Sequence, residues 1–437
     1  MKFRIFLIIS LVLIVSFTIG VSANDANYQD LWYPSPDADW VKSTDEINVW
    51  NLGAISGDPA IREMGLAFEA LTGIHVNFYE SSGSLEDMQR TLATQSTEFD
   101  VYDASWNWAI PDFINAGFAV SLNDVISERQ LNQWPESLQD SFMVEGEIYL
   151  APHQAETFAL YYRKDLIEKA IQDKNINWPP KNWDELVEAA KILTVDEDAD
   201  GNIDRYGLVY PAGGRGFNFE IYSTLVYAAG GSMFNKEGMP SFDTPEGHAA
   251  LQFMVDLVKK YNVAPTSVVN IDKGDIHDLM AAGSAAMCII ENSMIASLQG
   301  IETYGQNIEI MKMVPRTEDV DVHYYLKGLG FMVSKYSKHK QAAKYFAAFG
   351  SSYIGTWMEG VVELNGPTNT YALTNPYYIE RSSGAEVVAE SFVKGITENI
   401  PERAMVEDII RVGTQEAIRG TKSIDEAIQW MMSKLQE

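Results

Sequence analysis

The sequence predicts an α/β fold divided into two or three domains. Short segments typical of strands are followed repeatedly by longer segments whose apolar residues recur every three or four positions. Strand and helix signals that alternate in this way favour layers of helices on a sheet. The chain of 437 residues, 46% of them hydrophobic, is also longer than a single core usually supports.

The first 23 residues are predicted to be a secretory signal peptide. Lys2 and Arg4 precede an apolar run from Ile5 to Phe17, and the small residues of Val21-Ser22-Ala23 precede a cleavage site before Asn24. The alternative is an uncleaved membrane anchor, which the polar sequence after the site disfavours. No cysteine follows the run, so we expect no lipid anchor and a periplasmic protein, with secretion as the second choice.

Composition narrows the classes of partner and reaction. The 32 basic and 61 acidic residues give a net charge of −29, which repels phosphate backbones, so we expect no nucleic-acid partner. The sole cysteine, Cys288, has apolar neighbours and is predicted to be a buried small hydrophobe rather than a catalytic thiol. No nucleophile-elbow or metalloprotease motif occurs, and we expect no catalytic residues. A pair of glycosidase carboxylates among the 61 acids stays open as an alternative.

The amino-terminal third alternates strand and helix. The segment Ile74–Tyr79 alternates apolar and polar residues, as a half-buried strand does. The segment Pro59–Leu71 places its apolar residues on one helical face, namely Ile61, Met64, Phe68 and Leu71. The same criteria predict strands at 47–50 and 99–102 and helices at 85–92 and 110–118.

Capping signals mark several elements in the rest of the chain. Thr244-Pro245 opens a helix that continues to Lys260, and Gly230-Gly231 ends another. Ser423 with Glu426 forms a capping box. Strands are predicted at 146–152, 158–162, 206–210 and 285–290, and helices at 164–171, 182–193, 219–229, 276–282, 338–349, from about 405, and from 423 to the end.

Aromatic and polar residues follow three predicted strands. Asp103, Trp106 and Trp108 follow the third strand, Trp50-Asn51 ends the first and Glu80 ends the second. Ligands of α/β proteins bind at the carboxyl ends of the strands, and a sugar requires rings for its faces and carboxylates or amides for its hydroxyls. The alternative is that one or both tryptophans pack beneath the loop.

A glycine-rich segment, Gly213–Phe219, precedes a predicted helix. Its glycines allow close approach of a ligand, on which Phe217 or Phe219 would stack, with Asn218 between them as a polar contact. The alternative is a flexible loop without a binding role.

The acidic segment 196–204 matches much of a calcium-binding loop. Oxygen ligands are predicted at Asp196, Asp198, Asp200, Asn202 and Asp204, with Asn202 using its backbone carbonyl. Gly207 occupies the position of the usual bidentate glutamate, a departure that weakens or abolishes binding. We therefore expect no required cofactor and keep a structural Ca²⁺ as a hypothesis.

Short stretches in a fixed order resemble the extracellular solute-binding proteins of ATP-driven (ABC) importers, in the branch that includes the maltose-binding protein. Each stretch is weak alone, but together they span nearly the whole chain after the predicted leader. They are 146–152, 161–166, 182–186, 189–191, 230–231, 242–247, 250–253, 283–287, 337–340, 342–343 and 420–427.

The resemblance implies a type II periplasmic-binding-protein fold, in which two α/β lobes are joined by a three-segment hinge around a ligand cleft. It places the crossings near 153–158, 328–332 and 366–371. The implied lobe 1 comprises residues 24–153 and 330–366, and lobe 2 comprises 154–329 and 367–437. Closure of the lobes on a ligand would be a hinge motion.

The resemblance also adds candidate ligand residues. Glu156 matches a sugar-contacting glutamate of the family, with a hinge ion pair as the alternative. Asn292 lies where relatives often have a Gly-Trp pair, so the stacking platform of the family is missing there. Trp357 precedes the third crossing, and Asn365 and Thr368 lie at it as polar contacts. The alternative for Trp357 is a place in the core.

The implied function is capture of a mono- or oligosaccharide by a monomeric, non-enzymatic binding protein that delivers it to the membrane subunits of an ABC permease. A binding protein for another solute and a sensory receptor without transport are alternatives. A secreted carbohydrate-active hydrolase is a third.

Overall fold

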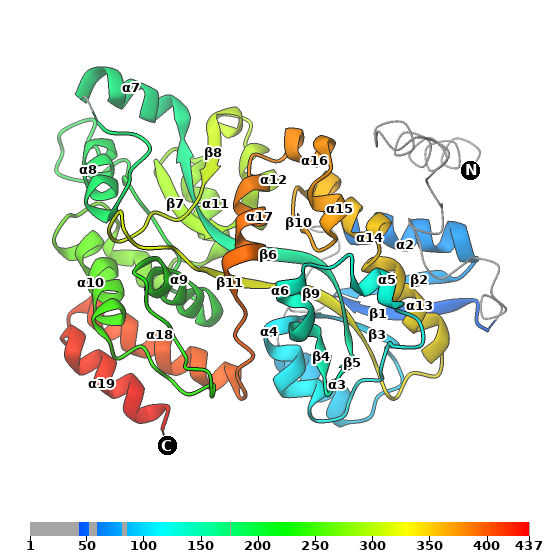
Figure 1. Ribbon diagram of the computed structural model, residues 1–437. Helices are drawn as coiled ribbons and strands as arrows, with labels where there is room; N and C mark the ends of the chain where they lie inside the picture. The colour runs from blue at the N-terminus through cyan, green and yellow to red at the C-terminus, as the bar shows by residue number, and fades with distance from the viewer. Residues whose placement is uncertain (1–42, 52–58, 81–84, 175, 437) are drawn as a thin grey trace. The chain divides into compact units, whose positions relative to one another are not determined.

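The computed structural model describes residues 43–51, 59–80, 85–174 and 176–436 (Figure 1). The predicted signal peptide and its cleavage site lie outside these residues. None of the helices within them is long and apolar enough to cross a membrane. The chain divides into two compact units. Unit 1 contains the described residues of Met1–Ala155 and Lys327–Ala385, and unit 2 those of Glu156–Leu326 and Glu386–Glu437.

Unit 1 is built on a mixed sheet with strand order β10-β6-β9-β3-β1-β2. Its strands are β1 (Glu46–Asn51), β2 (His75–Glu80), β3 (Val101–Ser105), β10 (Gly366–Pro367) and the unit 1 parts of β6 (Leu150–Arg163) and β9 (Tyr324–Val333). β1 pairs parallel to both β2 and β3, whereas β3 pairs antiparallel to β9. Parallel neighbours require crossover connections, which α2 (Pro59–Thr72) and α3 (Leu85–Ala93) provide. Figure 1 shows α2 on one side of these strands and α3 on the other.

Shorter elements complete unit 1. They are α4 (Trp106–Trp108), the π-helix η4 (Ala109–Ile114), α5 (Glu128–Leu131), α6 (Glu136–Gln139), η5 (Asp140–Phe142), the hairpin β4 (Met143–Val144) and β5 (Glu147–Ile148), α13 (Lys340–Gly350), α14 (Tyr353–Met358), the π-helix η9 (Glu359–Glu363), α15 (Thr370–Leu373) and α16 (Pro376–Arg381).

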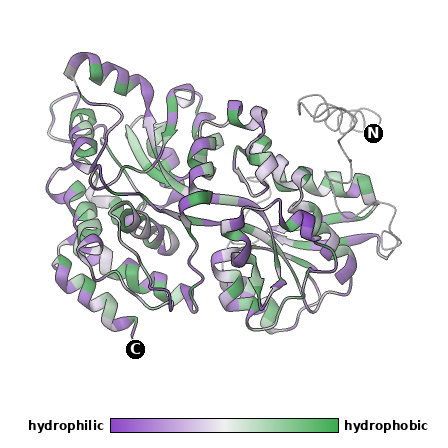
Figure 2. Cartoon of the chain, in the orientation of Figure 1, coloured by the Kyte–Doolittle hydropathy of each residue, from purple (hydrophilic) through white to green (hydrophobic). Residues whose placement is uncertain are grey.

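Unit 2 has antiparallel pairing of β6 with β7 (Met287–Glu291) and β8 (Ile308–Met311), and parallel pairing of β11 (Gly395–Ile396) with the start of β9. Its helices are α7 (Lys164–Lys174), α8 (Trp183–Leu193), α9 (Arg215–Ala228), α10 (Pro245–Lys259), η6 (Thr266–Asn270), α11 (Lys273–Ala281), η7 (Asn292–Met294), α12 (Ile295–Gln299), η8 (Gly305–Asn307), α17 (Ala385–Lys394), α18 (Arg403–Arg419) and α19 (Ile424–Lys434). The helices α9, α10, α18 and α19 pack together although α10 and α18 are far apart in the sequence (Figure 1). Figure 2 shows hydrophilic and hydrophobic residues interspersed along the outer helices α18 and α19, as amphipathic helices require.

Local capping signals predicted helix boundaries well. The Thr244 side chain accepts a hydrogen bond from Gly247 N at the start of α10, and Ser423 and Glu426 form the predicted capping box of α19. Cys288 lies fully buried in β7, where burial raises the pKa of its thiol, so its prediction as a small hydrophobe is confirmed.

Several predicted elements differ from the structure. The predicted strands 146–152 and 158–162 are replaced by the β4–β5 hairpin and one strand, β6, that continues past Pro152. On the β10 side Pro152 costs no ladder hydrogen bond, because pairing with β10 begins only at Gln154. The segment 206–210 makes isolated bridges at Tyr206 and Val209 rather than a strand. Leu71 was placed on the buried face of α2 but is 40% exposed.

The third crossing also differs from its predicted place. Residues 367–385 were assigned to lobe 2, but they belong to unit 1, and the chain enters unit 2 at the start of α17. The physical reason is a set of hydrogen bonds within unit 1. Gln133 O accepts one from Thr370 N at 2.8 Å, and Tyr353 Oη accepts one from Asn375 Nδ2 at 3.1 Å.

Candidate functional site

The parallel strands of unit 1 end at one edge of its sheet. Asn51 and Glu80 are partners in the register of β1 and β2, and Trp50 is paired with Tyr102 of β3. The structure therefore brings the predicted ligand residues at the ends of these strands together at one edge. Asn51 is buried at the end of β1, whereas Glu80 is exposed at the end of β2.

Trp106 packs inside unit 1. Its side chain is fully buried, its ring lies 5.1 Å from that of Phe142, and a Cβ added to Gly328 would lie 2.5 Å from it. Gly328 therefore leaves the space that the indole occupies. The indole Nε1 has no hydrogen-bond partner among the described residues. These contacts favour packing beneath the loop over a face presented to ligand.

The other candidate tryptophans differ in exposure. Trp50 is buried against Tyr102, and Trp357 is buried in a stack on Tyr353 with the rings 5.9 Å apart. Trp108 remains partly exposed and touches Phe113 edge-on. Of the four, Trp108 is the one whose ring has surface left for a ligand to contact.

Asp103 belongs to a buried charged cluster that we call the His153 cluster, formed by Asp103, His153 and Glu359. His153 Nε2 lies 3.0 Å from Asp103 Oδ1, and its Nδ1 lies 2.9 Å from Glu359 Oε1. All three side chains are fully buried. Burial alone would lower the pKa of His153, but the two carboxylates raise it to about 10. His153 is therefore an imidazolium at neutral pH.

The predicted polar contacts Asn365 and Thr368 lie beside this cluster. Asn365 Nδ2 donates to Glu359 Oε2 at 3.1 Å, and Thr368 Oγ1 donates to the carbonyl oxygen of Pro152 at 2.9 Å. Both are buried. Sequence reasoning missed His153 as the centre of this group, although a histidine inside an apolar strand was the available signal.

In unit 2, β7 ends at Glu291, and Asn292 follows it as the first residue of η7. Asn292 Oδ1 accepts a hydrogen bond from Thr157 N at 2.7 Å, while Tyr161 Oη donates to both backbone carbonyls at the strand end. Lys273 is ion-paired with Glu291. Asn292, predicted as a ligand residue, therefore joins the segment after β7 to β6. Its partner Thr157 comes directly after Glu156, which is 9% exposed.

The glycine-rich segment forms the start of α9, which begins at Arg215 rather than at 219. Phe217 is partly exposed in the first turn. Asn218 is fully buried: its Oδ1 accepts from Thr414 Oγ1 at 2.6 Å and its Nδ2 donates to Ala212 O at 3.1 Å. Both polar atoms of Asn218 are therefore used within unit 2.

A second buried charge cluster, missed by sequence reasoning, lies on α9 and α18. Arg403 Nε donates to Glu407 Oε1 at 2.6 Å, and its guanidinium lies 4.8 Å from the centre of the Phe219 ring. Tyr227 donates to Glu398 nearby. Burial raises the pKa of Glu398 to about 7, although the Tyr227 hydrogen bond and Arg403 oppose the rise. Arginine and glutamate four positions apart, such as Arg403 and Glu407, are common on helices. This pattern in the sequence therefore did not identify the buried cluster.

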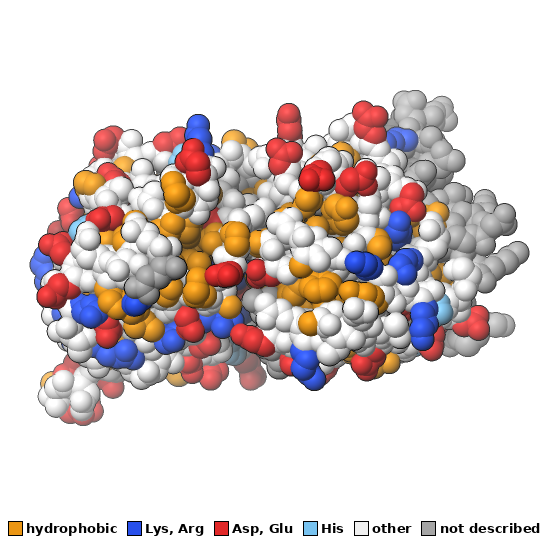
Figure 3. All heavy atoms as spheres, turned by 90° about the horizontal axis from the view of Figure 1, so that it is seen from below, with side chains coloured by type: hydrophobic (Ala, Val, Ile, Leu, Met, Phe, Trp, Pro, Cys, Tyr) orange, Lys and Arg blue, Asp and Glu red, His pale blue; other side chains and the backbone are white. Residues whose placement is uncertain are grey.

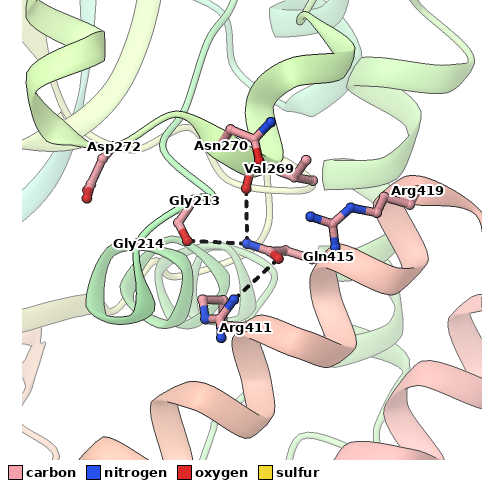
Figure 4. A pocket seen from close by; sticks show the side chains of 8 residues that line it. All are labelled: Gly213, Gly214, Val269, Asn270, Asp272, Arg411, Gln415 and Arg419. Carbon is pink, nitrogen blue, oxygen red and sulfur yellow. Dashed lines mark hydrogen bonds between the residues drawn. The ribbon is translucent and has the colours of Figure 1, made fainter.

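A surface hollow of about 360 Å³ lies between α18 and the loop before α9 (Figure 4). Gln415 lines it, and its Nε2 donates to Ala212 O at 2.7 Å and to Val269 O at 3.1 Å. Arg411 and Arg419 lie one turn to either side on α18. Because Gln415 already pairs with these carbonyls, its amide nitrogen helps to fix the loop in place.

The acidic loop places three of its predicted ligands together. Carboxylate oxygens of Asp196, Asp198 and Asp204 all lie within 4.8 Å of one another. Asp200 instead accepts a hydrogen bond from Asn202 N at 2.7 Å, and that bond lowers the pKa of its carboxyl. Gly207 has no room for a side chain, because a Cβ there would overlap the carbonyl oxygen of Ala190. Packing against α8 therefore explains why position 207 is a glycine and not the glutamate that is usual in a calcium-binding loop.

Comparison with known proteins identifies the family. Residues 54–353 match the family model described as bacterial extracellular solute-binding protein. The chain belongs to this family. A putative binding protein of Brucella abortus is 28% identical over 53% of this chain and 54% of that protein, so the match spans about half the length of that relative. The mannitol-binding protein of Pseudomonas aeruginosa is 25% identical over 77% of this chain and 79% of its own.

Solved structures of solute-binding proteins share the fold. A maltose-bound protein of T. maritima has a TM-score of 0.78 at 23% identity, covering 90% of this chain and 99% of that one. A solute-binding protein of Agrobacterium radiobacter in complex with ribitol has a TM-score of 0.74 at 20% identity, covering 90% and 98%. The predicted type II periplasmic-binding-protein fold and the family resemblance are both confirmed.

Proposed function

We propose that this solute-binding protein is the capture component of an ATP-driven importer and that its solute is a carbohydrate, either a sugar or a polyol. The observation that carries the proposal is the family match over residues 54–353. It is supported by a relative whose name specifies mannitol and by similar folds bound to maltose and ribitol.

Residues at the sheet edge of unit 1 suit such a solute. The partly exposed ring of Trp108 can stack on the apolar face of a sugar, and the exposed Glu80 can accept hydrogen bonds from hydroxyls. Within unit 2, Phe217 and Glu156 are the candidates with the same chemistry. We assign no catalytic residue and expect a monomer that delivers its solute from the periplasm to a permease.

Intrinsic tryptophan fluorescence tests the proposal with a panel of monosaccharides, oligosaccharides, polyols, amino acids and peptides. We expect saturable changes with one or more carbohydrates, and isothermal titration calorimetry should give the same dissociation constants. A response to amino acids or peptides alone would overturn the carbohydrate assignment. Chromatography of each carbohydrate after incubation would reveal turnover, which would instead support the hydrolase alternative.

The predicted calcium ion remains part of the proposal. The three converging carboxylates suit Ca²⁺, while the absence of a bidentate ligand at position 207 leads us to expect a weak site, with a dissociation constant on the order of 10⁻⁴ to 10⁻³ M. Calorimetric titration of the wild type with CaCl₂ should show binding that Asp198→Asn removes. Equal heats from both proteins would exclude the site.

A further inference from the structure

His153 lies on β6 shortly before the strand leaves unit 1 after Ala155. Both of its ring nitrogens face carboxylate oxygens, at 3.0 Å to Asp103 and 2.9 Å to Glu359. A carboxylate without a proton can only accept hydrogen bonds, so both nitrogens must donate. The ring also stacks on Phe331 of β9, with the ring centres 4.5 Å apart, which fixes its plane.

The charged groups around His153 come from two elements of unit 1, β3 and η9. Asp103 is on β3, Glu359 begins η9, and the half-buried Glu363 lies at the end of η9, where burial and the charge of Glu359 raise its pKa. Two buried carboxylates around one imidazolium leave a net negative charge in a site that water does not reach. A neutral histidine would leave one of these carboxylates facing a lone pair, which is costly in such a site.

The backbone around His153 is held from several directions. Thr368 donates to Pro152 O, and β10 pairs with β6 at Gln154 and Ala155. Asp103 connects the cluster to β3, whose next residues lead into the segment Ser105–Trp108. The position of that segment therefore depends on an ionic contact as well as on the backbone pairing of β3 with β9.

We propose that His153 is a positioning residue for solute binding: its imidazolium fixes Asp103, and through Asp103 it holds the segment Ser105–Trp108 in the conformation that contacts solute. This inference rests on the proposed function at the same sheet edge. It adds a residue that would hold the solute-contacting segment in place. His153 itself touches no solute, because its side chain is fully buried.

The first test does not require a solute. Amide hydrogen exchange of the whole chain should be faster in His153→Gln than in wild type at residues 101–108 and 150–155. His248→Gln is the matched control, because His248 also lies between two carboxylates, Asp243 at 2.9 Å and Asp425 at 3.1 Å, but its side chain is 30% exposed. Unchanged exchange at 101–108 in the His153 variant would overturn the proposal.

The second test uses a carbohydrate that binds the wild type. We expect His153→Gln to weaken binding on the order of tenfold, because a buried acceptor loses its donor, and His248→Gln to change it less than twofold. If exchange quickens while affinity is unchanged, His153 is structural only and the proposal fails. If wild type binds no carbohydrate, the proposed function fails instead, and the exchange test still decides whether His153 positions the segment.

A third test, with Asp103→Asn, distinguishes an effect of the His153 charge from an effect of packing. It can be carried out even if His153→Gln does not fold. In Asp103→Asn the imidazolium loses one of the two charges that hold its proton. Affinity in this variant, and the amide protection factors obtained after correction for the intrinsic pH dependence of exchange, should therefore depend on pH between about pH 6 and about pH 9, whereas those of wild type stay flat. The double variant Asp103→Asn with His153→Gln should be flat again. An Asp103→Asn variant without this pH dependence would contradict the proposal.

Discussion

At the scale of single residues, each unit contains an ionisable side chain that is buried away from water. His153 in unit 1 keeps its charge because two carboxylates surround it. Glu398 in unit 2 is different, because burial outweighs its favourable partners and its pKa rises from its ordinary value near 4.5 to about 7. Such groups link the stability of each unit to pH.

Glu398→Gln should change that pH dependence. The folded protein holds a proton on Glu398 that the unfolded chain releases near pH 4.5, so its contribution is fully present below that pH and is lost as pH rises through about 7. The variant should therefore be more stable than wild type above about pH 7, by at most about 3 kcal/mol. Urea unfolding across this range measures the difference. Glu237→Gln, at an exposed glutamate, should leave the profile unchanged.

The two tryptophans of the predicted binding loop should respond differently to truncation. Trp106→Ala removes a fully buried ring and should destabilise unit 1 by about 3–5 kcal/mol. Trp108→Ala should leave the free energy of unfolding within about 1 kcal/mol and weaken carbohydrate binding instead. Urea unfolding and fluorescence titration distinguish the two effects. A stable Trp106→Ala variant with lost binding would show that Trp106 contacts the solute.

At the scale of elements, close packing decides where side chains fit. Gly207 follows the acidic loop and lies against the end of α8, where Ala190 O leaves no space for a Cβ. Gly274, in the first turn of α11, has open space around it. The two glycines therefore have different roles, although both look permissive in the sequence.

Gly207→Ala should destabilise the protein by about 2 kcal/mol or more, because α8 must move to admit the methyl group. Gly274→Ala should be neutral or stabilising by up to about 1 kcal/mol, since alanine favours a helix. Thermal unfolding of both variants and wild type measures the contrast. Equal melting temperatures for the two variants would show that the loop relaxes freely.

At the scale of the whole molecule, the net charge of −29 opposes compactness. Acidic side chains are spread over the face in Figure 3 and lie among basic ones, so attraction between some pairs coexists with overall repulsion. One such group on unit 2 joins Lys312 to Glu386 at 2.7 Å and to Glu390 at 2.6 Å.

Salt should stabilise this protein because screening weakens the long-range repulsion. The melting temperature should rise by a few degrees as NaCl increases from about 10 to about 300 mM, where the Debye length falls below about 10 Å. KCl at equal ionic strength should give the same increase. A fall in the melting temperature would mean that attractive pairs such as those of Lys312 outweigh the net repulsion.

The sequence by itself determined the α/β class, the family resemblance and the boundaries set by local caps, such as those of α10 and α19. The helix caps depend on residues a few positions apart, so the sequence alone is enough to identify them. It also located the sheet edge where the strands of unit 1 end, because parallel strands place their carboxyl ends together.

Only the tertiary structure decided which residues at that edge are buried. Trp106 is covered by Phe142 and Gly328, and Asp103 is joined to His153 and Glu359, contacts made across 36 to more than 200 residues of sequence. Burial and pKa depend on such distant partners, which no local pattern reveals. The sequence could therefore predict the class of ligand chemistry, while the division between residues available to a solute and residues that hold the site together came from packing.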